Sequence, residues 1–376
     1  MPDKKIKSNL KPGDVLLHIG VHKTGTTTIQ DAFAQNRNEL LELGISYPGT
    51  RQAHRLIASS ALNRRLGWRP SGSPPPDPKL WHTFVDEGKK FSGITVCSSE
   101  FFAEATADEA ERIVDRIGKE NIHVVITLRN FAKILPSAWQ QILKSGYEFS
   151  YIHWLNNILG SDKLEPRSEV FWRRHRHDEV VNRWAKIVGS DRVTVVVVDE
   201  IDRESIYRDF ESLTGLPAGT LLKNHSASLN RSLTLAEAEL LRRVNEAVGG
   251  RTGWRPYSDQ IHDRLIKSMI EGRVPDVQEA KLQTPQWALD RAAEYATLYV
   301  EVIRSSGVNV LGDLNLLSKR LVGPTVINEE DVTELPISAA TAAILGALGG
   351  GSVKPLPTNY ERLRGKMKRT IRRKKL

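Results

Sequence analysis

The chain has 376 residues, of which 40% are hydrophobic and 26% charged, enough for one large α/β domain or two small ones. Its single cysteine, Cys97, excludes an intrachain disulfide and fits a reducing, cytoplasmic setting. The net charge of +9 is concentrated at one end, because residues 361–376 hold nine Lys/Arg and one Glu, leaving +1 for residues 1–360. The body of the chain therefore lacks the composition of a nucleic-acid-binding surface, and we expect no specific nucleic-acid partner.

The first fourteen residues are polar and lack the apolar region of a signal peptide. No run of about twenty apolar residues is present, so no membrane span is expected. These features predict a cytoplasmic protein.

Short apolar runs, whose apolar residues are contiguous rather than alternating, predict central parallel strands at 15–21, 93–97, 122–128 and 192–198. Helical patterns lie between and after them, at 26–43, 108–117, 134–144, 178–187 and 205–213. This alternation predicts a three-layer α/β fold with a mostly parallel central sheet and a P-loop-like core.

The C-terminal half is predicted to be mostly helical from 235 to 306, with a longer helix over 287–303. After Gly323 the chain is rich in Pro, Gly and Ala and has no helical or strand period. We therefore expect an α/β domain over 1–323, a low-complexity, poorly ordered linker over 324–360 and a basic tail over 361–376.

The stretch 18–30, HIGVHKTGTTTIQ, joins the first predicted strand to the first predicted helix. Gly20 and Gly25 have the spacing of an ordinary nucleotide-binding loop, but Thr26 stands where that loop has its lysine. The only lysine, Lys23, lies before the second glycine. Backbone N–H groups at a helix N-terminus bind anions, and four threonine hydroxyls lie within 22–28. The stretch therefore predicts an anion-binding loop in which Lys23 supplies the cation and no metal is expected.

The segment VHKTGTTTIQ resembles the 5′-phosphosulfate loop of sulfotransferases, which transfer a sulfuryl group from 3′-phosphoadenylyl sulfate (PAPS) and release 3′,5′-adenosine diphosphate (PAP). His22 replaces the proline that is common in the family. The resemblance implies that Lys23 contacts the bridge between phosphate and sulfate and that the loop holds the 5′-phosphate. The residues that it assigns to donor binding are His22, Lys23, Thr24, Gly25, Thr26, Thr27 and Thr28.

A second match lies about a hundred residues further on, in VVITLRNFAKILPSAWQQ. Arg129 ends an apolar strand and Ser137 follows eight residues later, which resembles the family's 3′-phosphate site. An arginine gives a forked, charge-assisted contact to phosphate, and a serine adds a hydroxyl. Phe131 replaces the family's usual proline and Pro136 is an addition, which leaves the start of the local helix open.

Looser matches extend the resemblance to a bacterial sulfotransferase-like branch over residues 15–314. It leaves two candidates for the base that accepts the acceptor's proton. Glu100 follows a predicted central strand, at the edge where open α/β sheets keep their sites; alternatively it caps the next helix. His54, in RQAHRLIA, is a histidine of the kind other sulfotransferases use; alternatively it is a surface or capping residue. Asp199 and Glu200, at another strand end, would help to shape the site.

Three functions remain open from the sequence. The sulfotransferase interpretation has PAPS as donor and a hydroxyl acceptor, on a carbohydrate or glycolipid. The second is an ATP- or GTP-dependent P-loop enzyme with Mg²⁺ that uses residues 20–26 and Asp199, against which stand the missing lysine after Gly25 and the Arg129/Ser137 pair. The third is a non-catalytic nucleotide-binding protein.

The basic tail has its own alternatives. Leu363, Met367 and Ile371 are spaced by four residues, so on a helix they form one apolar stripe among Lys and Arg. Such a segment suits peripheral attachment to an anionic surface at the inner membrane. The other interpretation is a disordered, solubilising tail.

Overall fold

The computed structural model describes residues 10–64, 75–160, 166–222, 231–249, 254–325 and 332–349. The chain divides into two compact units. Unit 1 comprises Met1–Trp139, Tyr151–Ala227 and Gln283–Ile327, and unit 2 comprises Gln140–Ser150, Ser228–Leu282 and Asn328–Leu376. The basic tail lies outside the described residues, so its predicted structure stays a prediction.

Unit 1 is built on a six-stranded sheet in which every pairing is parallel. The order across the sheet is β2-β3-β1-β4-β5-β6. All residues of β1, β3, β4 and β5 are buried, which explains why these strands have contiguous apolar sequences. The strands are β1 (Val15–His18), β2 (Ile45–Ser46), β3 (Ile94–Ser98), β4 (Ile122–Leu128), β5 (Val193–Val197) and β6 (Asn309–Leu311).

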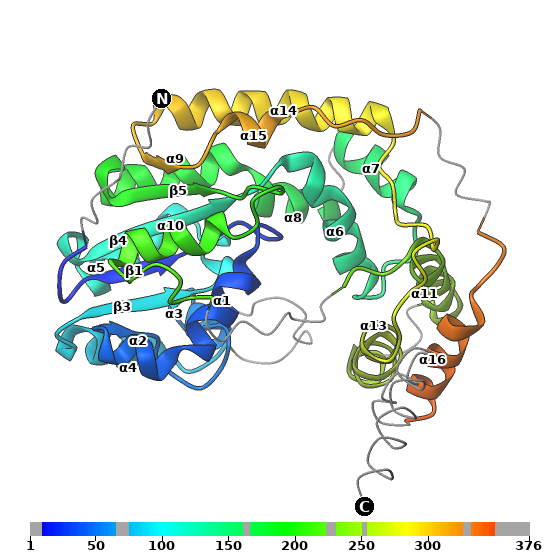
Figure 1. The fold of residues 1–376 in the computed structure, drawn as a ribbon, viewed down its shortest axis with the longest axis horizontal. Helices are drawn as coiled ribbons and strands as arrows, with labels where there is room; N and C mark the ends of the chain where they lie inside the picture. The colour runs from blue at the N-terminus through cyan, green and yellow to red at the C-terminus, as the bar shows by residue number, and fades with distance from the viewer. Residues whose placement is uncertain are drawn as a thin grey trace, which may run out of the picture. The chain divides into compact units, whose positions relative to one another are not determined.

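Helices cover both faces of this sheet, each over its own apolar core (Figure 1). One face packs against α4 (Lys79–Lys90), α5 (Ala107–Ile117), α9 (His177–Val188) and α14 (Gln286–Ser305). The other packs against α1 (Thr26–Gln35), α2 (Arg37–Glu42) and α10 (Ser205–Thr214). The predicted three-layer α/β fold with a parallel central sheet is confirmed.

Local sequence signals account for several helix ends. Thr106 and Glu109 form a reciprocal capping box at the start of α5, and Gly118 ends that helix.

One prediction was wrong in detail, because the single helix expected over 26–43 is two helices. Asn36 breaks it: its backbone leaves helical geometry, and its side-chain amide donates to the Ala32 carbonyl at 2.9 Å.

Unit 1 contains further helices and turns besides the sheet and the helices that cover it. They include α3 (Arg55–Ala61), a 3₁₀ turn η1 (Glu100–Glu104), α7 (Tyr151–Leu159), α8 (Pro166–His175) and α15 (Asn315–Ser318). The helix α6 (Phe131–Leu143) begins in unit 1 and ends in unit 2, with Pro136 inside it. Its start, left open by the sequence, is at Phe131, where the Asn130 side chain accepts a hydrogen bond from Ala132 N at 3.1 Å.

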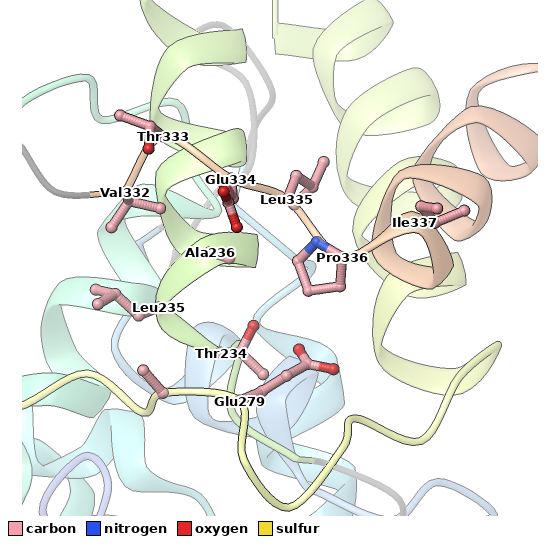
Figure 2. A pocket seen from close by; sticks show the side chains of 11 residues that line it. Thr234, Leu235, Ala236, Glu279, Val332, Thr333, Glu334, Leu335, Pro336 and Ile337 are labelled. Carbon is pink, nitrogen blue, oxygen red and sulfur yellow. The ribbon is translucent and has the colours of Figure 1, made fainter.

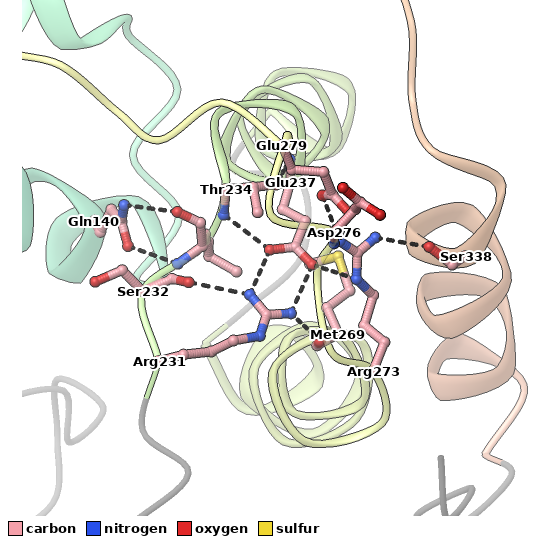
Figure 3. Close-up of polar contacts among 11 residues, drawn as sticks. Gln140, Arg231, Ser232, Thr234, Glu237, Met269, Arg273, Asp276, Glu279 and Ser338 are labelled. Carbon is pink, nitrogen blue, oxygen red and sulfur yellow. Dashed lines mark hydrogen bonds and ion pairs between the residues drawn. The ribbon is translucent and has the colours of Figure 1, made fainter. Parts of the chain in front are cut away.

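Unit 2 is helical, and a buried ion-pair network holds it together (Figure 3). Glu237, fully buried in the first turn of α11, accepts two hydrogen bonds of 2.7 Å from Arg231 and lies 3.3 Å from Arg273. Arg273 also pairs with Glu279 and donates to Ser338 at 3.1 Å. The helices of this unit are α11 (Leu235–Val248), α12 (Trp254–Tyr257), η4 (Ser258–Ile266), α13 (Lys267–Glu271) and α16 (Ile337–Ala347).

Helix α16 lies inside the segment that we expected to be a poorly ordered linker. Its buried side consists of Ala339, Ala342, Ala343 and Gly346. A Cβ atom at Gly346 of α16 would lie 2.6 Å from the carbonyl oxygen of Arg264 in η4. Glycine at this position therefore allows α16 and η4 to approach closely. Small residues made the segment look like low-complexity sequence, whereas here they form a packing surface.

Candidate functional site

The loop between β1 and α1 places a cation and a helix N-terminus together. Lys23 has a positive φ of 68°, a conformation that non-glycine residues adopt rarely. Gly25, the N-cap of α1, also has a positive φ of 81° and offers no side-chain cap to the first turn of the helix. The backbone N–H groups of that turn therefore suit an anion at the same end of the helix as Lys23.

Beneath the loop, buried hydroxyls and an imidazole form a hydrogen-bonded layer. The Thr24 hydroxyl donates to the Val21 carbonyl at 2.6 Å and lies 3.0 Å from the Thr127 hydroxyl. His18, fully buried at the end of β1, contacts Ser98 Oγ at 2.8 Å and Thr127 Oγ1 at 3.2 Å. Burial lowers the pKa of His18 to about 3, so its imidazole is neutral in the folded protein.

Gly20 and Thr26 pack closely beneath the loop. A Cβ atom at Gly20 would lie 2.0 Å from Thr127 Oγ1 and 2.8 Å from Thr26 Oγ1, so only glycine fits under the loop. Thr26 is 5% exposed, and its hydroxyl has no hydrogen-bond partner among the described residues. A buried hydroxyl without a partner costs free energy that a bound phosphate oxygen would recover. Of the other predicted donor-binding threonines, Thr27 is exposed and Thr28 is half-buried.

His22 points into a charged cluster beside the loop. Its Nε2 lies 2.9 Å from Glu104 Oε1, and Arg174 Nε donates to the same oxygen at 3.0 Å. Burial alone would raise the pKa of Glu104, but the hydrogen bond and charge of His22, with the charges of Arg174 and Arg64, lower it to about 2. Glu104 therefore stays ionised and orients His22 next to Lys23.

Glu100, in the turn after β3, lies at the same sheet edge. Gln30 of α1 donates to its Oε2 at 3.3 Å, and Arg55 NH2 lies 3.8 Å from its Oε1. Burial alone would raise the pKa of Glu100, but the charges of His22 and Arg55 and the Gln30 hydrogen bond outweigh burial and lower it. Glu100 is therefore an ionised carboxylate that is 15% exposed, near His22 and the loop.

His54 is buried, and both its ring nitrogens are engaged. Ser98 N donates to Nδ1 at 3.0 Å, which fixes the proton on Nε2, and Nε2 donates to the Pro48 carbonyl at 2.8 Å. Burial lowers the pKa of His54 to about 4. The imidazole joins the end of β3 to the segment that precedes α3, as a structural group does.

Arg129 follows β4 and reaches the loop. Its NH1 donates to the Lys23 carbonyl at 3.5 Å, and its Nε pairs with Glu200 beyond the end of β5. Ser137, half-buried, lies in the second turn of α6, the helix that follows Arg129 directly. Asp199 Oδ1 accepts hydrogen bonds from Ile201 N at 2.7 Å and Asp202 N at 3.3 Å, so this carboxylate shapes its own turn.

The structure adds residues that sequence reasoning did not assign. These are His18 and Thr127 under the loop, Glu104 behind His22, and the ion pair from Glu200 to Arg129. A signal existed for two of them, since His18 and Thr127 are polar residues within strands that are mostly apolar. No local pattern marks Glu104, because its partners lie about 40, 70 and 80 residues away along the chain.

A separate cavity of about 550 Å³ lies in unit 2 and contains none of the predicted site residues (Figure 2). Its walls are the first turn of α11, the Glu279–Ala280 segment and the chain leading into α16. Glu279 at its edge is already paired with Arg273. All residues that line the cavity belong to unit 2, and none belongs to the loop between β1 and α1.

Comparisons with known proteins give a similarity to a solved structure. No family model matches the chain, and no curated protein matches it. Among solved structures, the chain is similar to a sulfotransferase from Alicyclobacillus acidocaldarius, with 18% sequence identity and a TM-score of 0.40, over 65% of this chain and 99% of that one.

Two further observations concern the part of the chain that the structure describes. In those residues, no helix is both long enough and apolar enough to cross a membrane. The same residues contain no group of three or more His, Cys, Asp or Glu side chains suited to a metal ion. The metal-free reaction stays a prediction.

Proposed function

We propose that this protein is a sulfotransferase that moves a sulfuryl group from PAPS to an acceptor hydroxyl and releases PAP. One observation carries the proposal: Arg129 donates to the carbonyl of Lys23, so two candidate anion sites lie next to each other. The α1 N-terminus with Thr26 suits a 5′-phosphate. Arg129, with Ser137 on the following helix, suits a second phosphate that ATP lacks.

Lys23, the first turn of α1 and a base would each serve a different part of the sulfuryl transfer. As the acceptor oxygen forms its bond to sulfur, the bond from sulfur to the bridging oxygen breaks, and the electron pair stays on PAP. Lys23 offers a positive charge to that bridging oxygen, and the N–H groups of the α1 first turn stabilise the 5′-phosphate. A base must accept the hydroxyl proton of the acceptor.

Glu100 is the better supported of the two predicted bases. It is ionised, partly exposed and close to His22 of the loop, whereas both ring nitrogens of His54 are engaged in hydrogen bonds. A carboxylate with a lowered pKa is a weak base, so Glu100 would serve mainly by accepting the proton as the bond to sulfur forms. Comparing Glu100→Gln with His54→Ala at equal PAPS affinity tests this choice; a rate loss in His54→Ala alone contradicts it.

Calorimetric titration with PAP, and separately with ATP and Mg²⁺, tests the function itself. We expect PAP to bind more tightly, and Arg129→Ala to weaken PAP by about ten- to a hundredfold, because a charge-assisted contact to phosphate is lost. Preference for ATP with Mg²⁺ would favour the P-loop NTPase or kinase instead. PAP affinity that is unchanged in Arg129→Ala would contradict the placing of the 3′-phosphate.

We also propose a carbohydrate or glycolipid acceptor at an anionic membrane surface, reached through the basic tail 361–376. Support comes from the charge of the tail and from unit 2, where Ile337 and Ile344 of α16 and the adjoining Leu348 are 85%, 58% and 77% exposed. Helix α16 contains no charged residue. Exposed apolar side chains, in a chain that also carries a polybasic segment, suit attachment to anionic lipid.

A further inference from the structure

The ion pair between Arg129 and Glu200 occupies the position where the proposed function, on which this inference rests, needs a 3′-phosphate. Arg129 follows the last residue of β4, and Glu200 lies three residues beyond the end of β5. The two strands are neighbours, and Val198 N donates to the Leu128 carbonyl at 2.8 Å next to Arg129. The ends of two adjacent strands therefore bring a carboxylate directly onto the guanidinium.

Glu200 is a charged competitor in a positive environment. Burial alone would raise its pKa, but the hydrogen bond and charge of Arg129, with the charges of Lys133 and Arg203, outweigh burial and lower the pKa. The carboxylate is therefore ionised at neutral pH. The side chains of Arg129 and Glu200 are 25% and 32% exposed, so a ligand from solution can reach the pair.

The same guanidinium is tied to the loop. Arg129 NH1 donates to the carbonyl of Lys23, whose backbone is in the uncommon left-handed conformation. A ligand that moves the Arg129 guanidinium therefore acts on the backbone of the residue that supplies the cation of the loop. The ion pair and the loop form one connected polar chain, from Glu200 through Arg129 to Lys23.

We propose that Glu200 is an internal competitor for the 3′-phosphate, whose carboxylate holds Arg129 until that phosphate replaces it. A phosphate monoester offers three acceptor oxygens and up to two negative charges, against two oxygens and one charge from a carboxylate. A 5′-nucleotide without a 3′-phosphate has no group for this exchange and leaves Glu200 on Arg129. Glu200 thereby makes Arg129 respond to the 3′-phosphate rather than to weaker anions.

Titration of the full-length protein with PAP and with AMP, which lacks the 3′-phosphate, tests the exchange. Glu200→Gln keeps the side-chain length and a carbonyl oxygen for Arg129 but removes the charge. We expect it to bind PAP about three- to tenfold more tightly and AMP within about twofold of the native protein. Glu204→Gln is the matched control, because it removes the same charge four residues further on, at the N-cap of α10.

A double-mutant cycle shows whether the effect passes through Arg129. In an Arg129→Ala background, Glu200→Gln should give no gain in PAP affinity. A gain in PAP affinity that persists in the Arg129→Ala background overturns the proposal. Unchanged PAP binding by Glu200→Gln alone also overturns it. So does weaker PAP binding, since Glu200 would then orient the guanidinium for the phosphate. A native protein that does not bind PAP overturns the proposed function as well, whereas native PAP binding with an unchanged variant overturns this inference alone.

Discussion

In unit 2 the carboxylate of Glu237 is fully buried and is met by two arginines of the same unit, whereas in unit 1 the guanidinium of Arg129 is one-quarter exposed at the edge of the sheet. Each guanidinium of the Glu237 network pairs with a carboxylate of the same unit, although Arg231 Nε itself has no hydrogen-bond partner among the described residues. At the loop, by contrast, the Thr26 hydroxyl has no partner among the described residues, and Lys23 has a strained backbone. Charges satisfied inside a unit hold a fold together, whereas incomplete polar groups at a sheet edge indicate a ligand.

Replacing Lys23 tests the functional side of this comparison, and its expected effect is the largest. Lys23→Ala should lower the turnover of PAPS to PAP at least about a thousandfold, because a charge that stabilises the leaving oxygen is lost. The free energy of unfolding should change by about 1 kcal/mol or less, because Lys23 is only half-buried and the contact from Arg129 to its backbone is kept. Product release is measured by chromatography, with Lys79→Ala at an exposed position as the control. Turnover within about tenfold of native would contradict the role of Lys23.

Removing Glu237 tests the structural side. Glu237→Ala leaves Arg231 and Arg273 without their shared carboxylate, and Arg273 is only 7% exposed. We expect a loss of about 3–5 kcal/mol in the free energy of unfolding, measured in urea. Glu246→Ala removes an ion pair to Arg242 whose carboxylate side chain is 64% exposed, and should cost less than about 1 kcal/mol. Equal losses in the two variants would show that the Glu237 network adds no more than a surface pair.

Acid should weaken unit 1 through its buried histidines. The pKa of His18 is about 3 in the folded protein against 6.5 for the unperturbed group, so the unfolded chain takes up a proton that the folded state excludes. The part of the free energy of unfolding that depends on a neutral His18 is therefore fully present above pH 6.5 and is lost as the pH falls towards 3. Between pH 7 and pH 5 this loss is about 2 kcal/mol.

The measurement for His18 is urea unfolding at pH 7 and at pH 5. His18→Asn should lose about 2 kcal/mol less over this interval than the native protein, although it is less stable at pH 7. His262→Asn is the control in unit 2, since His262 is partly exposed and bonded to the neighbouring Asp263. A pH dependence that His18→Asn leaves unchanged would rule out His18 as its source.

The sequence predicted the α/β layers well because the relevant signals are local. Contiguous apolar runs identified β1, β3, β4 and β5, and a glycine or a capping residue marks the ends of α5. The division of the long first helix at Asn36 was missed, since an Asn side chain that bonds back to a carbonyl leaves the apolar period intact. Helix α16 was missed because its buried face is made of alanine and glycine, which carry little periodic hydrophobicity.

The candidate site could be predicted only in part. The spacing of Lys23 and Gly25 and the place of Arg129 at a strand end are readable from the chain, because each belongs to one strand–turn–helix segment. Partners of these residues come from other segments: Glu200 meets Arg129 from 71 residues away, and Glu104 meets His22 from 82. Such pairs form only when the strands align, so no local pattern records them.

The surface of α16 gives the smallest expected effect and extends the comparison to the lipid proposal. Ile337 and Ile344 are spaced by seven residues, so they lie on one face of α16, and Leu348 directly follows the helix; all three are exposed. If unit 2 faces anionic lipid, Ile344→Ser should weaken binding to phosphatidylglycerol vesicles by about two- to fivefold, through lost apolar contact. Deleting 361–376 should weaken it more, because each Lys or Arg near the surface adds about 1 kcal/mol.

Val322→Ser is the matched control for the vesicle experiment, since Val322 is 97% exposed but belongs to unit 1. Co-sedimentation at low and high salt separates the two contributions: salt screens the attraction between the tail and the lipid charge but leaves apolar contact in place. The relative effect of Ile344→Ser should therefore persist as salt rises, while the effect of the deletion shrinks. Equal weakening by Val322→Ser and Ile344→Ser would contradict a specific contact between α16 and lipid, and the exposed apolar residues of unit 2 would then have no more effect on vesicle binding than one of unit 1.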